Sequence, residues 1–386
     1  MPATSPLNDA PTAAAAEPAT VLVSFELSQT SWVLTVCSPI DGKLSRHTIA
    51  AADTVRLLSV LAGHRLRTER KAGVPARFIA IQEAGLDGFW LHRFLCAHAI
   101  ESHVVDAASI AAPRRRRRAK SDRIDGETLL RALAAWLRGE PRVCSMVVAP
   151  DVANEDRRRL SRERGELIRE RTSLTNRIKG LLASLGIHGF QPLKADRHAA
   201  LAALRDPEGG VPPSHLMAQL QRLVARIELL LEQLRAVEKA RDALLAEDAT
   251  TEASVSALLL KLRGIGPEFA TVLSAECFWR RFANRRQVAC YAGLTPTPWR
   301  SGSIRREQGI GEAGNPRLRQ TMVEMAWLWL RYQPGSALSQ WFQASVRGAS
   351  SRGRRIMIIA LARKLLIALW RYVTQGLLPE GAACRA

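Results

Sequence analysis

Apolar positions in the first third of the chain come in short runs separated by segments of helical periodicity. The runs are rich in β-branched residues, and Asp41-Gly42 is a strong hairpin turn between two of them. Strands are predicted at residues 21–27, 31–37, 44–49, 77–82 and 103–105, and helices at about 53–63, 87–99 and from residue 122 onward. The predicted order is therefore a meander of strands followed by βα units.

Four acidic residues stand where these elements would bring them together. Glu26 lies in the first predicted strand, Glu83 ends the fourth, and Asp122 and Asp125 open the following helix. The element order is that of ribonuclease-H-like nucleases, in which four such acids could hold two Mg²⁺ ions that clamp the oxygens of a phosphodiester. Carboxylates at i and i+3 share a helix face and repel each other without a cation between them. The alternatives are a solvated strand end at Glu83 and aspartates that merely favour a helix N-terminus.

A run of basic residues comes directly before the aspartate pair. It comprises Arg114, Arg115, Arg116, Arg117, Arg118 and Lys120, with Arg123 between the aspartates. We interpret this run as a contact to the backbone of DNA or RNA, and its alternative is a solvated loop. The formal net charge of +20 over 386 residues favours a polyanionic partner.

Several other classes of protein do not fit the sequence. No apolar run reaches the roughly 18 residues needed to span a bilayer, so no membrane partner is expected. The sequence has no lysine or arginine before Lys43 and thus lacks the basic start of a signal peptide. The six cysteines form no Cys-x-x-Cys pair, which indicates neither a zinc site nor a disulfide framework. We expect a cytoplasmic protein that binds nucleic acid.

The middle of the chain carries heptad repeats of leucine. Leu160, Leu167, Leu174 and Leu181 recur every seven residues, and a second repeat between residues 216 and 237 alternates steps of four and three. This pattern predicts a coiled coil, formed either as an antiparallel hairpin or between two copies of the chain. The predicted organisation is a disordered tail (1–19), an α/β domain with the acids (20–150), a helical coiled-coil region (151–250), a mainly α C-terminal domain (251–376) and a tail (377–386).

The C-terminal domain contains two further candidate sites. Residues 262–267 and the helix after them look like a helix-hairpin-helix, in which Gly264 and Gly266 would let the backbone approach a phosphate. Ser301 lies in a predicted polar loop beside Arg300, with Arg305 and Arg306 downstream. A serine hydroxyl can attack phosphorus if it loses its proton, although Ser-Gly is more often only a turn.

Taken in order, these motifs resemble the IS110 family of bacterial insertion-sequence transposases, including its IS1111 branch. The family's acidic motifs match Lys120-Ser121-Asp122-Arg123-Ile124-Asp125 and Glu83-Ala84-Gly85. Its C-terminal motifs match residues 264–266, 291–296, 301–302, 309–310 and 314–319. The resemblance covers about residues 20 to 375 and implies a RuvC-like N-terminal domain and a C-terminal serine transposase domain.

The resemblance also implies a mechanism. In the family, four acids bind Mg²⁺ and a serine becomes covalently joined to DNA; these would be Glu26, Glu83, Asp122, Asp125 and Ser301. In the family, a structured guide RNA from the element's flank can bridge donor and target DNA, and the protein assembles as an oligomer. For this chain the resemblance implies a homo-oligomer, either a dimer or a tetramer. The family's first acid is usually aspartate, so the extra methylene of Glu26 shifts the carboxylate by more than the roughly 0.5 Å tolerance of a preorganised site. Either the metals adjust or this copy is impaired.

Three hypotheses follow from the sequence. The first is a transposase that cuts and rejoins DNA through Ser301, with Ser303 as an alternative nucleophile. The second is a metal-dependent nuclease of the Holliday-junction type, in which water attacks and Ser301 is only a turn. The third is a non-catalytic remnant that binds nucleic acid and is disabled at Glu26.

Overall fold

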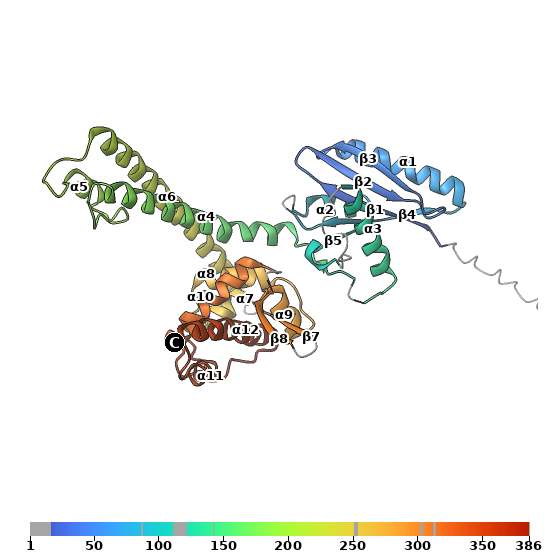
Figure 1. Ribbon diagram of the computed structural model, residues 1–386. Helices are drawn as coiled ribbons and strands as arrows, with labels where there is room; N and C mark the ends of the chain where they lie inside the picture. Colours follow the sequence, from blue (N-terminus) through green and yellow to red (C-terminus); the bar gives the residue numbers. More distant parts are fainter. Residues whose placement is uncertain are drawn as a thin grey trace, which may run out of the picture. The chain divides into compact units, whose positions relative to one another are not determined.

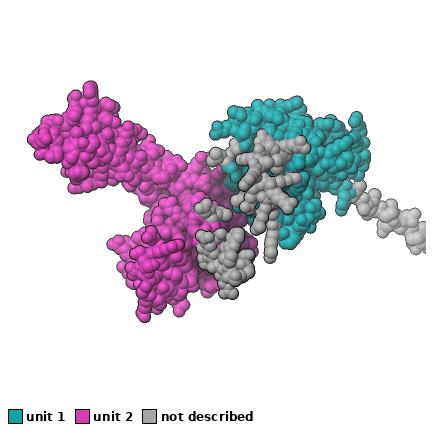
Figure 2. Space-filling model, viewed as in Figure 1, with its two compact units in different colours: residues 1–149 teal, residues 150–386 magenta. Residues whose placement is uncertain are grey.

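A computed structural model describes residues 17–85, 88–110, 122–141, 143–250, 254–301, 304–311 and 314–385. The side chains of residues 108, 122–124, 298–301 and 304–308 lie outside this description. The chain divides into two compact units, residues 1–149 (unit 1) and 150–386 (unit 2) (Figure 2). Unit 1 is α/β and unit 2 is mainly helical, as the hydrophobic pattern predicts (Figure 1).

Unit 1 is built on a mixed sheet with the strand order β3-β2-β1-β4-β5-β6. The strands are β1 (Ala19–Leu27), β2 (Ser31–Cys37), β3 (Leu44–Ala50), β4 (Ala76–Glu83), β5 (Glu101–Val105) and β6 (Met146–Val147). The first three form an antiparallel meander, and β4 and β5 run parallel to β1. Five strands match the predicted ones; the sequence pattern missed β6, which is two residues long and takes its place only by pairing with β5.

Helices cover both faces of this sheet. The helices of unit 1 are α1 (Thr54–Ala72), α2 (Trp90–Ala97), the short η1 (Ala107–Ser109) and α3 (Asp122–Leu137). Phe25 and Phe78 point into the core that contains Leu57 of α1 and Leu91 of α2. On the opposite face, α3 packs its leucines against β4 and β5. Because side chains alternate along a strand, Glu26 faces the same side as α3.

The long helices of unit 2 pack against each other within one chain. Helix α4 (Val152–Ala183) and helix α6 (Ser214–Ala249) run antiparallel, since Arg157 contacts Asp248 and Arg164 contacts Glu238. The heptad leucines of both helices form one buried core, joined by residues of the connecting segment around α5 (Arg197–Ala202). This arrangement is the predicted hairpin; a supercoil and a contact between two copies stay predictions.

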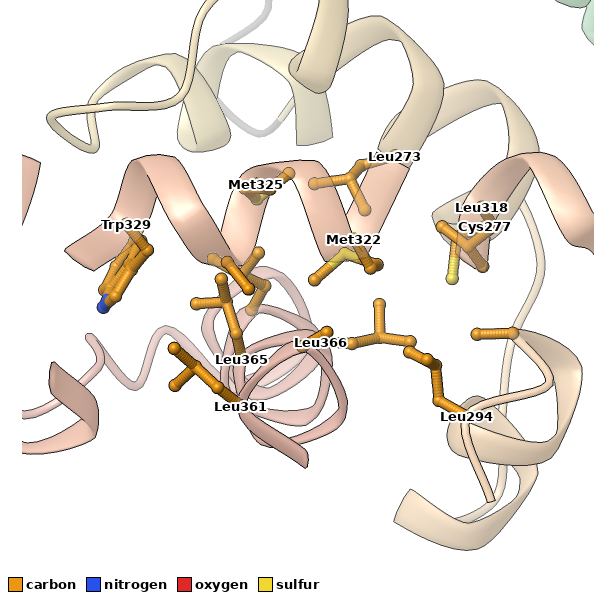
Figure 3. Packing of buried hydrophobic residues seen from close by; sticks show 14 of the residues in the cluster. Leu273, Cys277, Leu294, Leu318, Met322, Met325, Trp329, Leu361, Leu365 and Leu366 are labelled. Carbon is orange, nitrogen blue, oxygen red and sulfur yellow. The ribbon is translucent and has the colours of Figure 1, made fainter. Parts of the chain in front are cut away.

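The remainder of unit 2 is a helical domain with one hairpin. It contains α7 (Val255–Leu260), α8 (Pro267–Val272), the π-helix η3 (Leu273–Phe278), α9 (Arg285–Tyr291), the strands β7 (Pro296–Ser301) and β8 (Ile304–Ile310), α10 (Pro316–Tyr332), α11 (Ala337–Ser345) and α12 (Ser351–Gln375). Met322 and Trp329 of α10 pack on Leu361 and Leu365 of α12 in its core (Figure 3).

The prediction of a loop at Ser301 is wrong, because Ser301 is the last residue of strand β7. The antiparallel register pairs Arg300 with Arg305 and Ser301 with Ile304. Polar residues in a two-stranded ribbon give no alternating apolar signal, so the hydrophobic pattern could not reveal this strand.

Among the described residues, no helix combines the length and the apolar content needed to cross a membrane. The predicted disordered tail falls mostly on residues outside the description, but β1 begins at Ala19, before the predicted start of order at Val21.

A histidine pair between β3 and α1 makes unit 1 sensitive to acid. The Nε2 atoms of His47 and His64 lie 2.8 Å apart, so one ring donates and the other accepts, and at least one must be neutral. Burial, assisted by Arg67 and His47, lowers the pKa of His64 from 6.5 to about 4. Burial likewise lowers the pKa of His47.

We therefore expect unit 1 to lose stability as the pH falls from 6.5 toward 4. The unfolded state binds more protons over this range, so the free energy of unfolding should fall by on the order of 1–2 kcal/mol. Urea denaturation at several pH values measures this change. His64→Gln should flatten the dependence, whereas His188→Gln, at an exposed histidine of unit 2, should leave it unchanged. Equal pH dependence in the wild type and His64→Gln would contradict the assignment.

Candidate catalytic site

The carboxylate of Glu26 lies against the first turn of α3. Ser24 Oγ on β1 donates a hydrogen bond to the carbonyl oxygen of Gly126 at 3.0 Å. A Cβ added at Gly126 would lie 2.6 Å from Glu26 Oε1 and 2.6 Å from Thr35 Oγ1. Glycine is therefore needed for this close approach. The contact places half-buried Glu26 beside the turn that carries Asp125.

Glu83 lies on the neighbouring parallel strand at the same end of the sheet. The register pairs Phe25 with Gln82, so Glu26 and Glu83 are the next residues of β1 and β4. Ile79 and Ile81 of β4 face α3, and strand alternation puts Glu83 on that face as well. Glu83 is exposed, as the carboxyl end of a strand often is.

The aspartates occupy the first turn of α3, as predicted. The helix begins at Asp122, and Asp125 is half-buried. The side chain of Asp122 lies outside the description, as do the side chain of Arg123, residues 114–118 and Lys120. Among the described side chains, no three His, Cys, Asp or Glu residues lie close enough together to hold a metal ion. Glu26 is thus brought to the aspartate turn, and the four-acid site stays a prediction.

The glycine turn at residues 264–266 is packed by other parts of unit 2. Gly264 has φ +93°, and a Cβ there would lie 2.9 Å from Cβ of Tyr332. The C-terminal segment also closes on this turn, because Arg385 Nη2 donates to the carbonyl oxygen of Ile265 at 2.8 Å. These contacts explain the glycine at position 264 without a ligand. The phosphate contact of Gly264 and Gly266 stays a prediction.

Two of the C-terminal motifs form one packed turn at the base of the β7–β8 hairpin, whose first strand ends at Ser301. The backbone N–H of Asn315 donates to the carbonyl oxygen of Tyr291 at 2.7 Å. A Cβ at Gly314 would lie 2.6 Å from the same oxygen. Close by, the N–H of Gly311 donates to the carbonyl oxygen of Thr295 at 3.1 Å. The segments 291–296 and 314–319 therefore fix the base of β7 and β8.

Sequence reasoning missed a buried carboxylate, Glu276, that joins this turn to α4. Glu276 is 1% exposed and accepts hydrogen bonds from Arg162 Nε at 2.8 Å and Nη2 at 3.1 Å. Asn315 Nδ2 donates at 3.0 Å to Oε2, the oxygen that also accepts from Arg162 Nη2, while the Asn315 side-chain oxygen caps α10. Burial acts to raise the pKa of Glu276, but the bonds from Arg162 and Asn315 outweigh it and lower the pKa below its usual value. An acid inside an apolar segment was the available signal.

Comparison with known proteins defines the class. Residues 28–187 match a family model of DEDD-type IS110 transposases, described as Transposase, and residues 256–340 match the model described as Transposase IS116/IS110/IS902 family. A Sinorhizobium fredii protein described as a transposase, y4rJ, is 53% identical over 98% of both chains. The transposase for insertion sequence element IS1328 of Yersinia enterocolitica is 28% identical over 67% of this chain and 72% of its own. The transposase for insertion sequence element IS1111A of Coxiella burnetii is 27% identical over 66% of this chain and 67% of its own.

The fold and these matches define a transposase of an insertion sequence. The chain belongs to the IS110 family, as its motifs indicate. Membership implies that it binds DNA, and a DEDD-type domain implies a divalent metal. The matched segments include Glu83, Asp122, Asp125 and Ser301, whereas the first begins two residues after Glu26.

Replacement of Gly126 tests the contact between β1 and α3. In Gly126→Ala the new methyl group would collide with Glu26 and Thr35, so we expect unit 1 to lose about 1–3 kcal/mol. The rate of DNA cleavage should fall as well, because the new methyl group displaces the carboxylate of Glu26. Gly63→Ala is the matched control: its Cβ meets nothing within 4 Å inside α1, and it should stabilise by about 0.5–1 kcal/mol. Stabilisation in both variants would show that Glu26 is not held at Gly126.

Replacement of Glu276 tests the buried network. Glu276→Gln keeps the shape but removes the charge, and we expect a loss of about 1–3 kcal/mol in the free energy of unfolding of unit 2. Thermal denaturation measures the loss. The control is Glu166→Gln on α4, an exposed carboxylate 3.8 Å from Arg169, which should change stability by less than about 0.5 kcal/mol. Similar small effects of the two variants would contradict the role assigned to Glu276.

Proposed function

We propose that this transposase cuts and rejoins DNA through a covalent serine–DNA intermediate at Ser301, assisted by Mg²⁺ at Glu26, Glu83, Asp122 and Asp125. The observation that carries the proposal is the contact of Glu26 with the first turn of α3. It supports convergence of acids from a strand and a helix that are about 100 residues apart in the chain. The order of the family motifs supports Ser301 as the nucleophile.

The chemistry of the proposed ligands fits a hard divalent cation. Mg²⁺ prefers carboxylate oxygens, and all four proposed ligands are carboxylates. When bound, the ion would neutralise charge on the reacting phosphodiester oxygens. Glycine at position 126 gives the longer side chain of Glu26 the room that a Cβ would fill. This accommodation supports a working acid at Glu26 and argues against an impaired copy.

Ser301 stands at the end of a strand in a strongly basic hairpin. The backbone register pairs Arg300 with Arg305, and Arg306 is the next residue of β8. In the proposed step, the Ser301 hydroxyl loses its proton, Oγ bonds to phosphorus, and the bond to the leaving DNA oxygen breaks and that oxygen takes a proton. Attack by a hydroxyl of the other strand reverses the step and releases Ser301. The number of phosphodiester bonds is conserved, so no external energy source is needed.

We also propose a structured guide RNA from the element's flank and assembly as a dimer or tetramer. The net charge of +20 supports contact with more than one nucleic-acid strand. Arg114 to Arg118, Lys120 and Arg123 are the proposed backbone contacts beside the acids, and Gly264, Gly266, Arg300, Arg305 and Arg306 those of unit 2.

An adduct assay tests the proposed mechanism. The purified protein is incubated with element-end DNA, flanking RNA and Mg²⁺, and a protein–DNA band that resists denaturation is expected. Ser301→Ala and Asp122→Ala should abolish it, whereas Ser303→Ala, two residues away, should retain it. Loss of the band in Ser303→Ala but not in Ser301→Ala would move the nucleophile to Ser303.

Other outcomes separate the remaining hypotheses. Cleaved DNA without an adduct would support the nuclease in which water attacks. Binding without cleavage in the wild type, together with activity in Glu26→Asp, would show that the glutamate impairs this copy.

A further inference from the structure

The last long helix of unit 2, α12, belongs to a stretch of the chain that has many cations and no acids. Between Glu324 and Glu380 the sequence contains eight basic residues and not one aspartate or glutamate. The eight are Arg331, Arg347, Arg352, Arg354, Arg355, Arg363, Lys364 and Arg371. Helix α6 of the same unit, by contrast, carries six carboxylates in its 36 residues. The positive charge of unit 2 is therefore concentrated on and just before α12.

The cations of α12 are not compensated by the fold. Elsewhere in unit 2 a cation such as Arg162 is bound by a carboxylate, that of Glu276. None of the six cations on α12 forms an ion pair with a described residue. Lys364 contacts a ring instead, with its Nζ 4.4 Å from the ring centroid of Trp341. An anionic partner would thus find these charges free to bind it.

The stability of the helix does not explain where the arginines lie. Arg352, Arg354 and Arg355 are exposed within the first five residues of α12, and its first turn contains no acid. A helix N-terminus carries partial positive charge, so cations are unfavourable there. Ser350 already caps the helix, because its hydroxyl accepts from the Gly353 N–H at 3.2 Å. The arginines add repulsion that a bound anion would relieve.

The basic character continues along the solvent side of the helix. Arg352 and Arg363 are eleven residues apart, which is about three turns, so they lie one above the other. Arg371 is exposed about two turns further on. At 1.5 Å per residue, the axial distance from Arg352 to Arg371 is about 28 Å. Duplex DNA carries a charge about every 1.7 Å of its axis, so this length reaches several phosphates.

The opposite side of α12 distinguishes it from a helix that binds a membrane. Such a helix inserts a free apolar face into the lipid. The apolar face of α12, including Leu361 and Leu365, is occupied by the core of unit 2 (Figure 3). Ile356, at 57% exposure, is a single exposed apolar residue among the arginines, and scattered residues of this kind are normal at a protein surface. The exposed side therefore suits phosphate groups and not lipid tails.

We propose that this side of α12 binds the phosphate backbone of duplex DNA. We call it the basic face, and it consists of Arg352, Arg354, Arg355, Arg363, Lys364 and Arg371. Contacts of this kind hold and orient DNA without reading its sequence. Helix α12 lies outside both segments that match the family models, residues 28–187 and 256–340. The inference rests on DNA binding by the family and not on the serine mechanism.

The salt dependence of DNA binding tests the basic face. The full-length protein is titrated with a duplex of the element end at several salt concentrations, using the triple variant Arg352→Gln, Arg354→Gln, Arg355→Gln. Each lost phosphate contact lowers the slope of log K against log salt by about 0.9. We expect the slope to fall by about 2–3 and the affinity at about 0.1 M salt to fall about 10-fold or more. Unchanged slope and affinity would overturn the proposal.

Two matched variants show whether charge at this place is what matters. The triple variant with lysine at the same three positions keeps the charge, so its slope should stay within about 0.5 of wild type. The triple variant Arg222→Gln, Arg226→Gln, Arg235→Gln removes three exposed cations from α6, where carboxylates lie among them, and should also leave the slope unchanged. Equal losses from α6 and α12 would contradict a surface specific to α12.

Further measurements separate binding from folding and from catalysis. The α12 glutamine variant should not lower the melting temperature, because it removes mutual repulsion at a helix N-terminus. Ser301→Ala should bind the duplex as wild type does, so failure of the serine mechanism leaves this test intact. Single-stranded flanking RNA and vesicles containing phosphatidylserine serve as alternative partners. Loss of either in the glutamine variant, with unchanged affinity for the duplex, would overturn the assignment to DNA.

Discussion

The buried carboxylate of Glu276 is the constraint on which the C-terminal part of the molecule depends. Arg162 of α4 donates to both of its oxygens, and Asn315 at the start of α10 donates to one of them as well. An isolated charge at 1% exposure would be strongly unfavourable, so these partners must all be in place together. Asn315 also fixes the turn at Tyr291. The base of the hairpin that carries Ser301 is thereby tied to the long helix α4.

Unit 1 depends on a different kind of contact, in which the absence of a side chain is decisive. Gly126 allows α3 to approach β1 closely enough for the carboxylate of Glu26 to lie against the helix backbone. The four proposed acids lie on β1, β4 and α3, so the distances between them depend on how closely the helix and the sheet approach. A glutamate at position 26 needs more space than an aspartate, and the glycine provides it.

The arginines of unit 2 occupy two kinds of position. Arg162, Arg164 and Arg241 are bound to carboxylates and hold helices together. Arg300 of β7 and Arg305 of β8 are paired by the backbone register of the two-stranded ribbon, next to Ser301. Like charges on directly opposite residues of two paired strands are destabilising. The net charge of +20 is therefore not one uniform surface for nucleic acid.

The sequence by itself determined the order of strands and helices in unit 1, the buried faces of α4 and α6, and the family. Those features follow from local periodicity and from short motifs, which need no knowledge of distant contacts. It did not reveal β6, the strand that ends at Ser301, or the role of Glu276. β6 depends on pairing with the distant strand β5, and the role of Glu276 depends on Arg162, which is 114 residues away. The strand that ends at Ser301 pairs with the neighbouring β8, but its polar sequence carries no alternating apolar signal. The sequence identified Glu26 as a candidate acid. Only the packing of α3 on β1 showed that the glycine at position 126 leaves space for the Glu26 carboxylate.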